Sequence, residues 1–299
     1  MTGILVATQD GLRAFDERGH DGGVTLDRPI TAVVRDGTEL WAIVDGSELW
    51  HAPEGDWHQV TTLEGLEATC LAMTDAIHVG SSHARLFRLV EGELEAVTAF
   101  DEVEGRDTWF TPWDGPPSTR SISEWDDDVY VNVHVGGILR TSDGGASWRP
   151  TIDVDTDVHQ VATTEGLILA AGAYGLSMST DRGATWSLRA DGLESPYARA
   201  VVVCGDRLLV SASDGPRGGR AAVYRAGLVD GAFERSRAGL PEWFDDNIDT
   251  ACLDALNDGS YAAFGTADGR LFGSDDGGAT WLELVTGLGP ARHVLVVPG

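Results

Sequence analysis

The chain has 299 residues, of which 48 are Asp or Glu and 21 are Lys or Arg, so its formal net charge is -27. All of the basic residues are arginines. A surface this acidic disfavours nucleic acids and anionic membranes as partners, because both are negatively charged.

The chain shows no sign of membrane insertion or export. No run approaches 18 consecutive apolar residues, and residues 1–10 lack the basic start and long apolar run of a signal peptide. Cys70, Cys204 and Cys252 are widely spaced and lie in apolar runs, which predicts small buried hydrophobic side chains in a reducing compartment. We therefore expect a cytoplasmic protein.

Taken in order, the chain repeats one pattern: an apolar strand, a second apolar strand, a short strand and an amphipathic strand, separated by turns. Six such units span residues 30–61, 68–99, 120–152, 159–189, 199–237 and 250–285. Residues 4–8, 12–15 and 24–26 supply three more strands, and residues 292–297 supply a fourth. The repeat of about 40 to 50 residues is typical of β-propeller blades.

These units predict an all-β protein with a single domain, residues 1–299. We expect a seven-bladed β-propeller of four-stranded antiparallel blades, in which strands from the two chain ends share one blade. That arrangement removes open sheet edges. Six or eight blades are the alternatives, because three units lack the turn motif described next.

One octet occurs three times, at residues 141–148, 179–186 and 274–281, with the frame Ser/Thr-x-Asp-x-Gly-x-Thr/Ser-Trp. It predicts a tight turn between two strands. The aspartate accepts backbone N–H groups, the glycine adopts positive φ, and the tryptophan is buried at the start of the outgoing strand. The residues in these structural roles are Asp143, Gly145, Trp148, Asp181, Gly183, Trp186, Asp276, Gly278 and Trp281.

The octet resembles the Asp-box, or BNR, repeat of sialidases and related WD40/YVTN-like propellers. The resemblance implies the architecture, and it implies a site on the face opposite the Asp-box turns. The sialidase motif Arg-Ile-Pro is not matched, since Arg28-Pro29-Ile30 has the wrong order, and no Tyr/Glu nucleophile pair is evident. Propellers with this repeat that are not hydrolases include photosystem II assembly-factor-like proteins and sorting-receptor ectodomains.

The longest insertion, residues 101–119, is the first place to expect function, because long loops often carry binding residues. Trp109 and Trp113 offer flat surfaces for stacking, and Arg106 has the geometry to clamp a carboxylate. The alternative is a proline-stiffened cap whose tryptophans pack on the propeller. Residues 213–220 and 242–247 form two further loops on the same predicted face.

Polar residues at equivalent strand positions are expected to gather at the same rim. With the loop residues they form a candidate ligand-binding set: Arg106, Trp109, Trp113, Arg120, Asn132, His134, His159, Tyr197 and Arg199. We expect them to hold a small polar or anionic molecule, or to face a protein partner. The alternative is that they bond one another and water.

Enzymatic chemistry is the remaining option. The acids eligible for glycoside hydrolysis are Asp107, Asp157, Glu242 and Asp246. A metal set of His134, Asp157 and His159 is a weaker alternative, and no cofactor motif is found. The sequence favours a non-catalytic binding or scaffold protein, with a glycoside hydrolase or a metal-dependent enzyme as the alternative.

Overall fold

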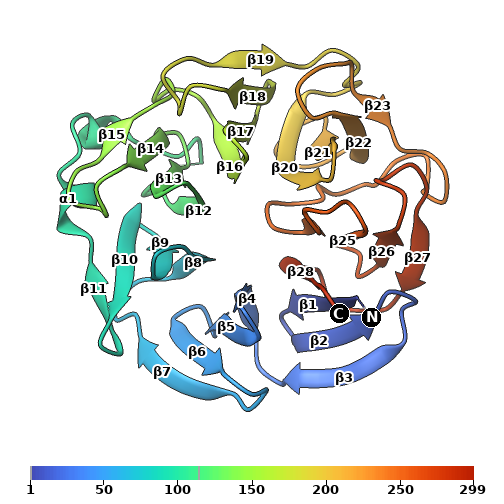
Figure 1. Ribbon diagram of the computed structural model, residues 1–299, viewed down its shortest axis with the longest axis horizontal. Coiled ribbons are helices and arrows are strands. Elements are labelled where there is room, and N and C mark those ends of the chain that lie inside the picture. Colours follow the sequence, from blue (N-terminus) through green and yellow to red (C-terminus); the bar gives the residue numbers. More distant parts are fainter. Residues whose placement is uncertain (1, 114) are drawn as a thin grey trace. The chain divides into compact units, whose positions relative to one another are not determined.

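The computed structural model of the protein describes residues 2–113 and 115–299; Met1 of the N-terminal stretch and Asp114 of the 101–119 insertion lie outside the described residues. The strands form seven four-stranded antiparallel sheets, so the fold is a seven-bladed β-propeller (Figure 1). Two short helical turns, α1 (Thr98–Asp101) and η1 (Arg106–Thr108), interrupt the β structure. No helix among the described residues is long and apolar enough to cross a membrane.

The chain divides into two compact units: unit 1 comprises Met1–Ile30, Ala171–Leu176 and Leu188–Gly299, and unit 2 comprises Thr31–Ala170 and Ser177–Ser187. The single domain expected from the sequence stays a prediction. The strands of unit 1 are, sheet by sheet, β28 (His293–Val297), β1 (Gly3–Thr8), β2 (Gly11–Asp16) and β3 (Asp21–Leu26); β20 (Tyr197–Cys204), β21 (Arg207–Ser213), β22 (Ala222–Gly227) and β23 (Glu234–Arg235); and β24 (Leu253–Ala255), β25 (Ala262–Gly265), β26 (Leu271–Ser274) and β27 (Leu282–Val285).

Unit 2 holds three further sheets. The one residue of these sheets that belongs to unit 1 is Ile30, the first residue of β4. Their strands are β4 (Ile30–Asp36), β5 (Glu39–Val44), β6 (Glu48–Ala52) and β7 (His58–Thr62); β8 (Ala68–Met73), β9 (Ile77–Ser81), β10 (Arg85–Val90) and β11 (Glu93–Ala96); and β12 (Thr119–Trp125), β13 (Asp128–Val133), β14 (Gly137–Thr141) and β15 (Arg149–Pro150). The seventh sheet is divided between the units: β16 (Val158–Thr164), β17 (Leu167–Gly172), β18 (Gly175–Ser179) and β19 (Ser187–Arg189).

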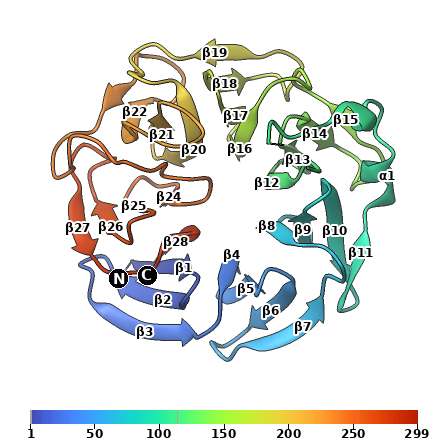
Figure 2. The ribbon, with the colours of Figure 1, turned by 180° about the vertical axis from the view of Figure 1, so that it is seen from behind.

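The shared sheet of unit 1 confirms the predicted use of both chain ends. Strand β28 pairs with β1 antiparallel, with Ile4 opposite Val296 and Val6 opposite Val294. All four of these side chains are buried, so apolar contacts stabilise the pairing of the two strands in addition to the backbone hydrogen bonds. Figures 1 and 2 show β28 lying against β1 from both sides.

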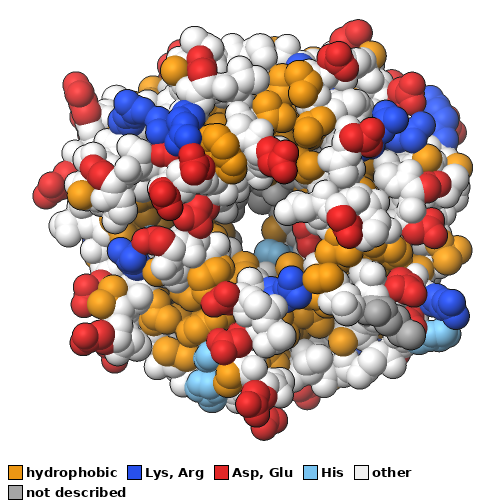
Figure 3. All heavy atoms as spheres, viewed as in Figure 1, with side chains coloured by type: hydrophobic (Ala, Val, Ile, Leu, Met, Phe, Trp, Pro, Cys, Tyr) orange, Lys and Arg blue, Asp and Glu red, His pale blue; other side chains and the backbone are white. Residues whose placement is uncertain are grey.

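Apolar faces of the sheets form the core. In unit 1, Phe264 stacks on Phe272 with ring centroids 4.9 Å apart, and Trp281 meets Phe264 edge-on at 4.8 Å. The three cysteines are free and buried, as predicted, and burial raises the pKa of Cys70 to about 12. Red acidic side chains are scattered over the face drawn in Figure 3 and outnumber the blue arginines.

The three octets fold into one turn with one hydrogen-bonding pattern. Asp143 accepts the backbone N–H and the hydroxyl of Ser147 at 2.9 and 2.6 Å, and the hydroxyl of Thr141 accepts the N–H of Gly145 at 3.0 Å. The turns at 179–186 and 274–281 repeat these bonds. The predicted glycines have φ of 87°, 84° and 77°, and the preceding residues Gly144, Arg182 and Gly277 are also left-handed.

Each octet tryptophan packs on the segment that follows the outer strand of the preceding sheet. Trp148 meets Phe100, which follows β11, at 5.2 Å, and Trp186 Nε1 donates to the carbonyl of Thr151, which follows β15, at 2.8 Å. The backbone N–H of Trp281 donates to the carbonyl of Ala238, which follows β23, at 3.0 Å. Only Trp281 of the three is fully buried, so the predicted burial is complete in one turn and partial in two.

Several strands are shorter than expected. Strand β15 has two residues where residues 148–152 were predicted, because Pro150 has no N–H to continue the ladder. Strand β24 begins at Leu253 instead of 250, because Cys252 N–H bonds the carbonyl of Asp249 in a turn with Ala251 at φ 62°. Helix α1 occupies four residues where no helix was expected.

A buried ion network ties the octet turn at 179–186 to the sheet of β12–β15. Asp128, with 2% of its side chain exposed, accepts from Arg140 at 2.7 and 2.8 Å and from Arg182 at 2.7 Å. Arg182 also pairs with Asp126 and lies over the ring of Trp125 at 4.7 Å. The left-handed Arg182 is therefore held by its own side chain.

We predict that Asp128→Asn destabilises the protein by about 3 kcal/mol, because it leaves a buried guanidinium without its counter-charge. The control is Asp127→Asn, whose side chain is exposed and whose left-handed φ of 66° asparagine tolerates. Urea unfolding followed by tryptophan fluorescence measures both. Equal stability of the two variants would contradict the role given to the network.

The octet turns also predict an acid dependence of stability. Hydrogen bonds from Ser147 and Thr185 lower the pKa values of Asp143 and Asp181 to about 2, below the unfolded value of about 3.9. A depressed folded-state pKa contributes stability that is present above about pH 4 and lost as the pH falls towards 2.

We therefore expect the free energy of unfolding to fall less steeply between pH 4 and about 2 in the double variant Asp143→Asn, Asp181→Asn than in the wild type. The control, Glu104→Gln with Asp107→Asn, removes the same charge from an exposed loop. Urea titrations at several pH values give the slopes; a double variant as acid-sensitive as the control contradicts the prediction.

Candidate functional site

The 101–119 insertion is anchored by Arg106, which sits in unit 2 with all of its contacts. Its Nη1 and Nη2 donate to the carbonyls of Ala84 and His83 at 2.9 and 3.0 Å, and Asp101 lies 3.4 Å away. His83 and Ala84 are consecutive left-handed residues, a costly conformation for side chains with a Cβ. Arg106 therefore stabilises the β9–β10 turn, and its carboxylate-clamping role stays a prediction.

Trp109 packs inside the fold. This position agrees with the alternative interpretation of the insertion, a proline-stiffened cap whose tryptophans pack on the propeller. Only 7% of Trp109 is exposed, Arg106 lies over its ring at 4.8 Å, and Phe100 contacts it at 6.0 Å. A Cβ on Gly136 would come within 3.0 Å of the Trp109 ring, so the β13–β14 turn closes directly over it. In both views α1, where the insertion begins, lies beside β15 (Figures 1 and 2).

The second half of the insertion projects from this anchor. Phe110 is 48% exposed and Trp113 is 58% exposed, and both are among the most exposed large apolar side chains of the described residues. The hydroxyl of Thr111 bonds the carbonyl of Gly115 at 3.2 Å across the tip. Pro112, Pro116 and Pro117 restrict the backbone around it. Sequence reasoning named Trp113 but missed Phe110, although its position beside Trp109 was a signal.

The tip lies at the end of β14 opposite the octet turn. Phe110 N–H donates to the carbonyl of Val135 at 3.3 Å, and His134 N–H donates to the carbonyl of Ser118 at 3.0 Å. Val135 and His134 both belong to the turn that precedes β14, whereas the octet 141–148 follows it. The insertion thus brings its exposed aromatics next to the turn that carries His134.

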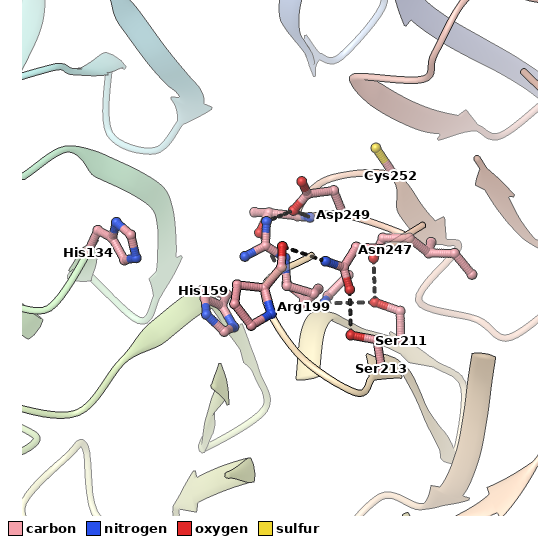
Figure 4. A network of polar contacts seen from close by, with 12 residues as sticks. His134, His159, Arg199, Ser211, Ser213, Asn247, Asp249 and Cys252 are labelled. Atoms are coloured by element: carbon pink, nitrogen blue, oxygen red, sulfur yellow. Dashed lines mark hydrogen bonds and ion pairs between the residues drawn. The ribbon is translucent and has the colours of Figure 1, made fainter. Parts of the chain in front are cut away.

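His134 and His159 converge on Asp157 in unit 2. Their Nε2 atoms lie 3.5 and 3.3 Å from the same oxygen of Asp157, whose side chain is 21% exposed, while both histidines are buried. Burial raises the pKa of Asp157, but the hydrogen bonds from His134 and His159 outweigh it and the net pKa is lowered. Figure 4 shows both histidine rings.

The remaining predicted polar residues of unit 2 are engaged with their own fold. Asn132 is fully buried; its Nδ2 donates to the carbonyl of Val158 at 2.9 Å and its Oδ1 accepts from Ser121 at 3.1 Å, which joins β13 to β12 and β16. Arg120 also has an interaction partner. These partners of Asn132 are not members of the candidate set, so the ligand-binding set stays a prediction.

Tyr197 and Arg199 lie in unit 1, where they join a network that the sequence did not reveal. Arg199 pairs with Asp249 and lies 5.9 Å from the ring of Tyr197. Ser213 donates to Asn247 at 2.5 Å, and Ser211 donates to the carbonyl of Ile248 at 2.7 Å (Figure 4). These two bonds join residues 34 and 37 positions apart, and such a separation carries no local signal for pairing.

The four candidate catalytic acids lie on three separate segments, two in unit 2 and one in unit 1. In unit 2, Asp107 is exposed on the insertion and Asp157 is bonded by two histidines; in unit 1, Glu242 and Asp246 are exposed on one loop. Among the residues that the structure describes, no group of three or more His, Cys, Asp or Glu side chains is arranged to hold a metal ion. The metal set and the catalytic acids stay predictions.

No protein-family model matches the sequence, and no curated protein matches it either. Solved structures match the fold. YCF48 bound to a D1 peptide has a TM-score of 0.60 at 14% identity, over 95% of this chain and 85% of that chain. YCF48 from Cyanidioschyzon merolae gives 0.62 at 13% identity, over 89% and 94%. The WD40 repeats of RRP9 give 0.62 at 11% identity, over 89% and 83%.

Identities this low show the fold alone. The chain is a β-propeller with WD40-like structural neighbours.

Arg106 generates a prediction about the anchor of the insertion. Arg106→Gln should destabilise the protein by about 2 kcal/mol, because two charge-assisted hydrogen bonds to left-handed backbone are lost. Arg88→Gln, which removes an exposed pair with Asp75, should cost about 0.5 kcal/mol or less. Urea unfolding provides both values, and a loss for Arg106→Gln no larger than that for Arg88→Gln would show that the anchor is dispensable.

Proposed function

We propose that this protein is a non-catalytic binding propeller that docks a protein partner on the aromatic tip, defined as Phe110 and Trp113 with the intervening residues. The observation that carries the proposal is that two large aromatic side chains are about half exposed on a proline-restricted loop. Aromatic side chains held in place before binding are typical hot spots, because little conformational entropy is lost on association.

A protein partner is favoured over the small anionic molecule expected from the sequence. The guanidinium of Arg106 is already bonded to two carbonyls, and both histidines face a carboxylate within their own unit. An anion would have to compete with these internal partners. The exposed apolar surface of the tip has no such competitor, and burying it on a partner is favourable.

The comparisons and the octets support the same assignment. One neighbouring structure is YCF48 bound to a D1 peptide, so a propeller of similar fold takes a peptide ligand. The repeated octet hydrogen bonds support placing the chain among Asp-box propellers. A single domain and a cytoplasmic location, as the sequence indicates, belong to the proposal. A glycoside hydrolase is the less favoured alternative, since Asp107 and Asp157 lie on different segments and Asp157 is already in contact with two histidines.

The test is a selection of short displayed peptides on the folded protein, followed by affinity measurement on Trp113→Ala and on Tyr174→Ala. Tyr174 is 72% exposed in unit 1 and serves as the matched aromatic control. Trp113→Ala should weaken the selected peptides by about tenfold or more, equivalent to about 1.4 kcal/mol, and Tyr174→Ala should change affinity by about twofold at most. Peptides that bind both variants as they bind the wild type would place the docking surface elsewhere.

A further inference from the structure

The aromatic tip lies between two acidic segments of unit 2. On the N-terminal side of the same insertion, Glu102, Glu104 and Asp107 are exposed. On the other side, Asp153 and Asp155 are exposed in the segment between β15 and β16. We call these five acids the acidic rim.

The second segment reaches the tip through the β13–β14 turn. A Cβ on Gly137 would come within 3.3 Å of the carbonyl oxygen of Asp153, and Val135, two residues before Gly137, accepts the N–H of Phe110. The segment that carries Asp153 and Asp155 therefore borders the β13–β14 turn, and that turn is hydrogen-bonded to Phe110 of the tip. Both flanks of the exposed aromatics carry negative charge.

The arginine side chains next to the insertion are already engaged with partners inside unit 2. Arg106 is the one arginine of residues 101–119, and it is bonded to the carbonyls of His83 and Ala84 and paired with Asp101. Asp101 is also paired with Arg85 at 2.7 Å. Arg85, Arg106 and Asp101 together carry one net positive charge, so the five acids of the rim outweigh them and this group of residues is net negative.

We propose that the partner docks through a basic, extended segment of its chain, and that the acidic rim selects it. This inference rests on the proposed function. Lysine or arginine side chains would place their cationic heads against the rim and their methylene stems on Phe110, while a guanidinium or ammonium group lies over the ring of Trp113. An acidic segment would be rejected by like charges on both flanks.

The charge of the whole chain acts in the same direction. A formal charge of -27 raises the local concentration of cationic segments and speeds their encounter with the surface. The same field repels nucleic acids and anionic lipid surfaces, so a protein segment is the cationic occupant that the surface fits.

The experiment uses the full chain and the peptides that were selected on the wild type. Two synthetic probes are added. In the first, arginine alternates with glycine and leucine; in the second, glutamate replaces each arginine. Three proteins are compared: the wild type; the rim variant Glu102→Gln, Glu104→Gln, Asp107→Asn; and a control, Asp206→Asn, Glu234→Gln, Asp245→Asn, that removes the same charge from exposed positions in unit 1. Circular dichroism checks that each variant is folded.

We expect the arginine probe to bind and the glutamate probe not to bind. The rim variant should lose about tenfold or more in affinity and the control about threefold at most, because the control lowers the net negative charge equally but leaves every acid of the rim in place. Raising NaCl from about 0.1 M to about 1 M, which shortens the Debye length from about 10 Å to about 3 Å, should weaken the arginine probe by about tenfold.

Two failures are distinguishable. If selected peptides depend on Trp113 but are neutral or acidic, and if the rim variant binds them as the wild type does, then the basic-segment inference is overturned and the docking function stands. If no selected peptide depends on Trp113, then the proposed function is overturned together with this inference.

Discussion

The pairing of β28 with β1 is the constraint on which the fold depends. It places four residues of the C-terminal end opposite buried residues of the first strand, so the first sheet exists only when both chain ends are present. Until then β1–β3 are a three-stranded sheet with an exposed inner edge, which is a poor state for an apolar strand. The sheet is therefore closed by a contact between residues almost the whole chain apart.

The octet turns supply the second level of order. Each uses one carboxylate and one hydroxyl to satisfy the donors of a tight left-handed turn. Trp148 and Trp186 contact the segment behind the preceding outer strand, whereas the ring of Trp281 packs on Phe264 of its own sheet. The turn and the packing are coupled, because the ring reaches its neighbour only if the backbone reverses within these few residues. The buried Asp128 network adds an ionic contact at one of these turns, where arginine replaces the glycine of the others.

Most of the polar residues that the sequence suggests as functional make hydrogen bonds or ion pairs within the fold. Arg106 stabilises two left-handed residues, Asn132 joins neighbouring strands, and His134 and His159 share one carboxylate. Buried polar groups are costly unless they are paired, and these residues make their contacts within their own unit. What is left exposed on the same side of β14 is apolar and acidic, and this is the surface that a partner would meet.

Much of the architecture was readable from residues alone, because strand period, turn glycines and the Asp-x-Gly octets are local signals. The spacing of the apolar runs predicted seven four-stranded blades and a sheet shared by the chain ends, and both are present. The short β15 and the late start of β24 were missed, since Pro150 and the turn at Asp249 end or delay pairing in ways that hydrophobic patterning ignores. Trp109 and Trp113 look alike in sequence, yet one is buried against Gly136 and the other projects into solvent. That difference is set by packing between segments distant in the chain, because whether a side chain is a core residue or an exposed anchor depends on what lies across from it.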